Sequence, residues 1–162
     1  MPRVVNVVFA GLGGQGVIKA SDILADAACR AGLDVKKADV HGMSQRGGSV
    51  NSDVRFGDEV LSPMVPGGEA DYLVVLAPDQ VENARGALRQ GGVLLAPDLI
   101  DEKSLPNRRS LNVALLGALS HHLSIADEHW RAAIEAALPE RLRQVNFKAF
   151  EQGRAAARAK AA

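Results

Sequence analysis

The sequence contains a single cysteine, Cys29, among its 162 residues. One cysteine excludes a disulfide within the chain, and it excludes any zinc or iron–sulfur site built only from cysteines of this chain. Cys29 lies in the helix-like stretch AACRAG, where a cysteine usually packs as a small buried apolar side chain. If the protein takes part in redox chemistry, we therefore expect the redox centre to lie elsewhere.

Aromatic residues are also few, and the chain carries no net charge. Aromatic residues make up 4% of the chain, and 19 basic residues balance 19 acidic ones. A net charge of zero gives no overall field that would attract nucleic acid or an anionic membrane, so we expect neither partner. No stretch reaches the ~18 apolar residues of a membrane span, and the first residues do not have the pattern of a signal peptide. We therefore expect a cytoplasmic protein.

The sequence does contain a glycine-rich turn between a predicted strand, Val4–Ala10, and a predicted helix that begins near Val17. Glycines permit a tight backbone turn, and Gly16 is expected to let the helix lie close to the strand. The free N–H groups at the start of such a helix can bind an anion. The residues expected to form this site are Gly11, Gly13, Gly14, Gln15 and Gly16. By itself the pattern is weak evidence for a dinucleotide, because the same glycines can serve the turn alone.

Further strands and helices alternate after this turn, and the apolar spacing predicts where they lie. Strands are expected at residues 33–40, 49–56, 71–77 and 93–96, and helices at 17–32, 78–89, 111–122, 127–138 and 144–159. Residues 59–62 are expected to return as the hairpin partner of the strand at 49–56, after the turn at Gly57 and Asp58. The predicted fold is α/β, with a Rossmann-like open, mainly parallel sheet, helices on both faces, a β-hairpin excursion and a helical C-terminal end. We expect one domain over residues 1–162.

A polar, glycine-rich loop follows the second predicted strand, from His41 to Gly48. Arg46 precedes two glycines, so a side chain with five donors stands beside a backbone that can approach another surface closely. The alternative is a surface turn with a solvated arginine, because loops of this composition are common. His41 could act as a general acid or base, but a lone histidine in a polar loop more often bonds to the backbone.

No complete catalytic or metal-binding set is apparent. Asp39 lies about where an acidic residue holds the ribose of a bound dinucleotide, but its neighbours Lys36 and Lys37 are equally compatible with a plain ion pair. The chain has no nucleophile elbow, no phosphate-loop lysine and no paired metal-ligand motif. We therefore assign no catalytic residue and no metal ligand to this chain.

Four motifs, in this order, resemble the small γ-type subunit of 2-oxoacid:ferredoxin oxidoreductases. They are GLGGQG at 11–16, HGMSQRGGSVNSDVRFG at 41–57, LSPMVPGGEADYLVVL at 61–76 and NFKAFEQG at 146–153. Within that family the motifs are most similar to the β subunit of indolepyruvate ferredoxin oxidoreductase. The chain is short for this branch, mainly between Asp98 and Ser110.

The resemblance implies a subunit of a thiamine diphosphate enzyme that converts a 2-oxoacid, such as indolepyruvate, with coenzyme A and oxidised ferredoxin into acyl-CoA and carbon dioxide. Thiamine diphosphate, Mg²⁺ and [4Fe–4S] clusters are then expected on a large partner subunit, and the isolated chain is expected to be inactive. The resemblance leaves open whether the glycine loop contacts an anion such as part of coenzyme A. The loop expected to meet the catalytic subunit near its active site consists of His41, Ser44, Gln45, Arg46, Gly47 and Gly48.

The alternative is a protein of a different class, a free-standing NAD(P)-binding oxidoreductase. It would use the glycines at 11–16 to hold the pyrophosphate and Asp39 to hold the ribose.

Overall fold

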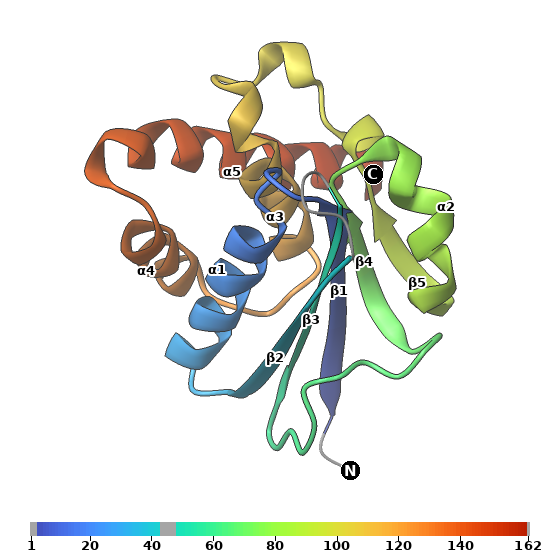
Figure 1. Cartoon of the computed structure of the whole chain (residues 1–162). Helices are drawn as coiled ribbons and strands as arrows, with labels where there is room; N and C mark the ends of the chain where they lie inside the picture. The colour runs from blue at the N-terminus through green and yellow to red at the C-terminus, as the bar shows by residue number, and fades with distance from the viewer. Residues whose placement is uncertain (1–2, 43–47, 162) are drawn as a thin grey trace.

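The structure is a computed structural model that describes residues 3–42 and 48–161. Its centre is a five-stranded sheet with the strand order β2-β3-β1-β4-β5. The strands are β1 (Val4–Leu12), β2 (Asp34–His41), β3 (Ser49–Gly57), β4 (Ala70–Val75) and β5 (Leu88–Leu95). Only β3 runs against the other strands, because it pairs antiparallel with both β1 and β2, while β4 is parallel to β1 and to β5. The predicted open, mainly parallel sheet is confirmed (Figure 1).

The antiparallel hairpin is formed by β2 and β3, so the prediction of a strand at residues 59–62 was wrong. Both edges of β3 are already occupied, one by β1 and the other by β2, which leaves no free edge for a further strand. The segment after β3 is instead tied to polar side chains of that strand. Arg55 Nη1 donates to the Ser62 carbonyl at 2.8 Å, and the Val65 N–H donates to Asp53 Oδ2 at 2.9 Å.

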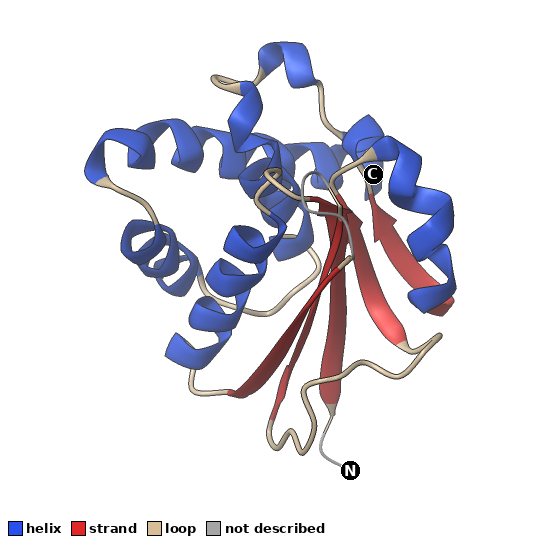
Figure 2. Ribbon diagram, in the orientation of Figure 1, coloured by secondary structure: helices blue, strands red, loops and turns tan. Residues whose placement is uncertain are grey.

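Helices cover both faces of the sheet, as predicted (Figure 2). On one face lie α1 (Val17–Arg30), α3 (Leu111–Ser120), α4 (Asp127–Ala137) and α5 (Glu140–Ala161), and on the other lies α2 (Val81–Ala84) between two short 3-10 turns. Successive residues of β1 separate the two cores: Phe9 packs in the larger one and Val8 in the smaller one. No helix of the described residues is long and apolar enough to cross a membrane.

Two sequence predictions about these helices need correction. The helix expected at residues 78–89 is only one turn of α-helix, because β5 already begins at Leu88 and continues through Gly91 and Gly92. Gly91 has a φ of +78°, a backbone conformation that disfavours a side chain but fits glycine. Cys29 is exposed on α1, not buried as predicted.

The crossing of α3 and α5 depends on two glycines. A Cβ added at Gly153 would lie 1.6 Å from the Ala114 carbonyl oxygen, and one at Gly117 would lie 1.9 Å from that of Phe150. The two helix backbones therefore touch at each of these glycines. Beside this contact, the ring of Phe150 packs against fully buried Trp130 with 5.5 Å between ring centroids. Part of the NFKAFEQG motif thus serves helix packing.

We predict that Gly153→Ala destabilises the fold by about 1–3 kcal/mol or more. The added methyl group would overlap with the backbone of Ala114, and no side-chain movement can relieve that overlap. Urea unfolding followed by the fluorescence of Trp130, the only tryptophan, measures the effect. Gly86→Ala is the matched control, since a Cβ there meets nothing within 4 Å. Equal stability of the two variants would contradict the proposed backbone contact.

Candidate functional site

The glycine loop lies at the carboxyl ends of the parallel strands, at the point where the chain turns to opposite sides of the sheet. From β1 the chain passes through α1 to β2 at one edge, whereas from β4 it passes through α2 to β5 at the other edge. The end of β1 and the end of β4 stay together, and the Leu76 N–H donates to the Ala10 carbonyl at 2.8 Å. In open α/β sheets, ligands bind in the crevice at such a switch point.

The glycines of this loop have different structural roles. Gly14 and Gly16 have φ values of +89° and +84°, which side chains rarely adopt. The sequence predicted that Gly16 lets the helix lie close to the strand. Gly16 packs against α3 instead, because a Cβ there would lie 2.4 Å from Asn112 Nδ2. The close approach between strand and helix occurs at Gly11, where a Cβ would lie 2.8 Å from Val17 Cγ2.

The start of α1 is open to a ligand. Gln15 closes the loop, because its Oε1 accepts a hydrogen bond from the Leu12 N–H at 2.8 Å. Gly16 caps the helix without a side chain, and the first turn carries no acidic residue. Among the described residues, the free N–H groups and the positive end of the helix dipole therefore have no side-chain anion to neutralise them.

Two arginines face this loop across a cavity of about 460 Å³. Arg108 and Arg109 belong to η5 (Arg108–Ser110), the turn that leads into α3, and Asn107 Oδ1 orders this turn by accepting from the Arg109 N–H at 2.9 Å. Neither arginine forms an ion pair with a described residue. Asn112, one turn further on, donates from Nδ2 to the Gly16 carbonyl at 3.2 Å and so joins α3 to the loop.

These arginines were missed by the sequence analysis, because they lie far from the glycine loop along the chain. The available signal was the pair Arg108 and Arg109 directly before a predicted helix. Together, the two guanidinium groups and the start of α1 form an electropositive site that suits a phosphate or carboxylate.

The structure also brings His41 to the glycine loop. A second cavity, of about 390 Å³, lies on the opposite side of the loop and is lined by His41, Lys19 and the loop glycines. The Gly13 N–H donates to the Gly48 carbonyl at 2.9 Å, so the end of the polar loop is bonded directly to the glycine loop. Ser44, Gln45, Arg46 and Gly47 lie outside the described residues.

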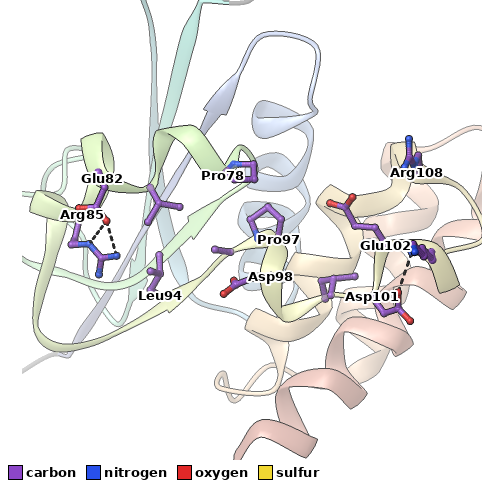
Figure 3. A pocket seen from close by; sticks show the side chains of 13 residues that line it. Pro78, Glu82, Arg85, Leu94, Pro97, Asp98, Asp101, Glu102 and Arg108 are labelled. Atoms are coloured by element: carbon purple, nitrogen blue, oxygen red, sulfur yellow. Dashed lines mark hydrogen bonds and ion pairs between the residues drawn. The ribbon is translucent and has the colours of Figure 1, made fainter.

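A larger cleft of about 860 Å³ opens beside the arginines, at the ends of β4 and β5 (Figure 3). Its floor is apolar and includes Leu94 and Pro97, while Glu82 and Arg85 lie at one end, 3.1 Å apart. Arg108 lines this cleft as well as the glycine-loop cavity, so the two spaces adjoin. Arg108 can therefore contact a ligand in either space.

Asp39 is not placed to bind a ribose. Strand β3 lies between β2, which carries Asp39, and β1, which leads into the glycine loop. The carboxylate accepts from Lys37 Nζ at 2.5 Å and from Ser52 Oγ at 2.6 Å. Burial acts to raise the pKa of Asp39, but these two hydrogen bonds and the charge of Lys37 outweigh it and hold the pKa below its ordinary value. The plain ion pair is the interpretation that this geometry supports.

Metal ligands do not gather in the described parts of the chain. No three histidine, cysteine, aspartate or glutamate side chains come together there in a way that could hold a metal ion.

The family model for pyruvate ferredoxin/flavodoxin oxidoreductase matches residues 6–106 and 96–156. The chain belongs to this oxidoreductase family. The match covers the glycine loop, the polar loop and the α3–α5 pair, so it includes every segment that forms the site.

Individual relatives agree with this family. The chain is 32% identical to the indolepyruvate oxidoreductase subunit IorB of Pyrococcus horikoshii over 193 aligned positions, which cover 94% of this chain and 96% of that subunit. It is 33% identical to the 2-oxoglutarate synthase subunit KorC of Archaeoglobus fulgidus over 94% of this chain and 88% of that subunit. The crystal structure of the keto/oxoacid ferredoxin oxidoreductase γ subunit of Geobacter sulfurreducens superposes with a TM-score of 0.80 at 27% identity, and covers 96% of this chain and 99% of that one. The expected resemblance to γ-type subunits of this oxidoreductase family is confirmed.

We predict that Asp39→Asn lowers the urea midpoint at neutral pH and that the loss disappears in acid. The folded-state pKa of Asp39 lies below the ordinary value of 3.8, so ionised Asp39 stabilises the fold above that pH. This stabilisation is lost as the pH falls through the lower folded-state pKa. Urea unfolding at about pH 7, 5 and 3 measures the difference from the wild type.

Ser52→Ala is the matched comparison for this experiment, because it removes one hydrogen bond to Asp39 and leaves Lys37 in place. It should show a smaller loss with the same pH dependence. A loss that stays constant over the whole pH range would rule out the charge of Asp39 as its cause.

Proposed function

We propose that the chain is a subunit of a thiamine-diphosphate-dependent 2-oxoacid:ferredoxin oxidoreductase and is inactive alone. The complex would convert a 2-oxoacid, coenzyme A and two oxidised ferredoxins into acyl-CoA, carbon dioxide, two reduced ferredoxins and a proton. The proposed substrate is an aryl pyruvate, such as indolepyruvate, after the indolepyruvate oxidoreductase subunit that matches nearly the whole chain; the similar identity to the 2-oxoglutarate synthase subunit supports the 2-oxoacid class alone.

The proposal divides the chemistry between two chains. A single exposed cysteine supplies one thiolate, whereas a [4Fe–4S] cluster takes four cysteine ligands, so the residues of this chain do not fit the cluster. We place the clusters, thiamine diphosphate and Mg²⁺ on a large catalytic subunit. Bound there, thiamine diphosphate supplies the stabilisation of the carbanion that decarboxylation needs.

The role proposed for this chain is to hold an anionic part of a substrate at the glycine loop. The observation that carries this role is the convergence of Gly14, Gly16 and the start of α1 with Arg108 and Arg109 at the switch point of the sheet. Among the substrates of the proposed reaction, coenzyme A carries phosphates and the 2-oxoacid carries a carboxylate, and we place the phosphates of coenzyme A at this site. The adjoining cleft at Arg108 has room for a further part of such a molecule.

The polar loop from His41 to Gly48 is proposed to contact the catalytic subunit near its active site. The hydrogen bond from Gly13 to Gly48 supports this role, because it couples the loop to the proposed anion site. A contact that moves the polar loop would then also move Gly13, because Gly13 is hydrogen-bonded to Gly48.

A free-standing NAD(P)-binding oxidoreductase is less well supported by the geometry. In the dinucleotide-binding fold, the acidic residue that holds the ribose stands on the strand next to the first one. Here β3 occupies that position, and Asp39 is engaged by Lys37 and Ser52.

We predict that the chain co-purifies with the large thiamine-dependent subunit encoded in the same genome, and that only the complex oxidises the 2-oxoacid. Arg46→Ala should leave the chain folded but weaken the complex or slow its turnover. Arg30→Ala is the control, because Arg30 is an exposed residue at the far end of α1. Co-expression with affinity purification, followed by a ferredoxin-reduction assay, measures both effects. If the wild-type chain fails to co-purify with any such subunit, the proposed function is wrong.

We predict that removing both guanidinium groups, with Arg108→Ala and Arg109→Ala together, raises the KM for coenzyme A about tenfold or more, since hydrogen bonds to a charged group contribute about 1.5–3 kcal/mol. The KM for the 2-oxoacid should stay unchanged. Steady-state kinetics of the assembled complex distinguish the two constants, again with Arg30→Ala as the control. An equal rise in both constants would refute an anion site at these arginines.

A further inference from the structure

A groove of about 600 Å³ lies between α5 and the segment that joins β5 to α3. One wall is α5 and the other is formed by Arg131 of α4 together with Ser104 and Pro106 of the joining segment. Gln152 Nε2 donates to the Ser104 carbonyl at 3.0 Å and fixes the joining segment to α5. The residues that α5 contributes are Gln144, Phe147, Lys148, Glu151, Gln152 and Ala155.

The packing of the core does not account for all of these residues. In the NFKAFEQG motif, Asn146, Phe150 and Gly153 are buried, whereas Phe147 is only half-buried and Lys148 is fully at the surface. Phe147 packs partly against the core and also lines the groove, where it is joined by Lys148. The motif therefore has one side that packs the helices together and another that faces outward.

The groove combines an apolar floor with a rim of two basic residues, Arg131 and Lys148, and one acidic residue, Glu151. The guanidinium of Arg131 lies 4.3 Å from the centre of the Phe147 ring, which holds this arginine at the edge of the groove. Lys148 adds a second positive charge there, while the carboxylate of Glu151 lies 3.7 Å from Arg154. Such a surface fits a segment that presents an apolar side chain between carboxylates.

This chain is also shorter than the relatives with which it aligns. In the alignment with the Pyrococcus horikoshii subunit, about 40 of the 193 positions have no residue of this chain, because 94% of 162 residues accounts for only about 152 of them. The two stretches matched by the family model both include residues 96–106, so the match is interrupted in this region. Residues 96–106 belong to the segment that joins β5 to α3, which forms one wall of the groove.

We propose that this groove is a docking site for a segment of the large catalytic subunit, with an apolar side chain seated on Phe147 and Ala155 and carboxylates paired with Arg131 and Lys148. The inference depends on the proposed function, because it takes its partner from it. It adds a second contact surface on α5, formed by elements other than the glycine loop and the polar loop.

Two variants test the groove without touching the core. Ala155→Trp fills it with a large side chain, and Lys148→Glu reverses the charge at its rim; both residues are exposed, so the fold should persist. Each should weaken binding of the large subunit at least tenfold, as measured by biolayer interferometry with the purified large subunit immobilised. The matched controls are Ala136→Trp on the exposed side of α4 and Lys160→Glu near the end of α5, which lie outside the groove and should bind like the wild type.

The outcomes separate the two proposals. If the wild-type chain does not bind the large subunit, the proposed function fails and the docking inference fails with it. If the wild type and both groove variants bind equally well, only the docking inference is overturned. If Ala155→Trp abolishes self-association of the isolated chain in analytical ultracentrifugation but leaves binding of the large subunit intact, the occupant is a second copy of this chain and the inference is wrong.

Discussion

The contact between Gly16 and Asn112 determines the geometry of the candidate site. It joins residues 96 positions apart, the start of α1 and the start of α3. A side chain at position 16 would separate them, because a Cβ would lie 2.4 Å from the amide nitrogen of Asn112. Since α3 begins directly after Arg108 and Arg109, the close approach of the two helix ends also brings both guanidinium groups to the glycine loop. One backbone position without a side chain thus assembles an electropositive site from two distant segments.

The insertion of β3 between β1 and β2 separates this fold from a dinucleotide-binding one. The antiparallel strand moves β2 to the edge of the sheet, and with it the acidic residue that would hold a ribose. The same insertion brings the connection between β2 and β3 back to the glycine loop, where the Gly48 carbonyl accepts from Gly13. This fold therefore lacks the ribose site of a dinucleotide-binding fold, and it has a contact between the polar loop and the glycine loop. The glycine motif alone is common to both folds, so it could not distinguish them.

Local sequence patterns predicted correctly the strands and turns that neighbouring residues determine. They did not predict features that depend on contacts between residues far apart in the chain. The apolar runs of β1 and β4 and the glycines before α1 indicated those elements correctly, because burial and turn geometry act within a few residues. Residues 59–62 were assigned as a strand because a turn precedes them, yet both edges of β3 are taken by other strands. The approach of Arg108 to the glycine loop depends on how α3 packs, which no local pattern encodes. Four residues of the polar loop, 44–47, stay a prediction.

The openness of the site explains why such a chain would need a partner. Arg108 and Arg109 are exposed, and between charges in water an attraction at 4 Å is worth only about 1 kcal/mol, against about 4 kcal/mol where the surroundings are less polar. A second chain placed over the glycine loop would exclude water and strengthen every contact to a bound anion without adding a new one. The cavities on both sides of the loop lie at the carboxyl ends of the parallel strands, so a single covering surface could close them together. Binding of the anion and assembly of the complex would then favour each other, because each removes water that weakens the other.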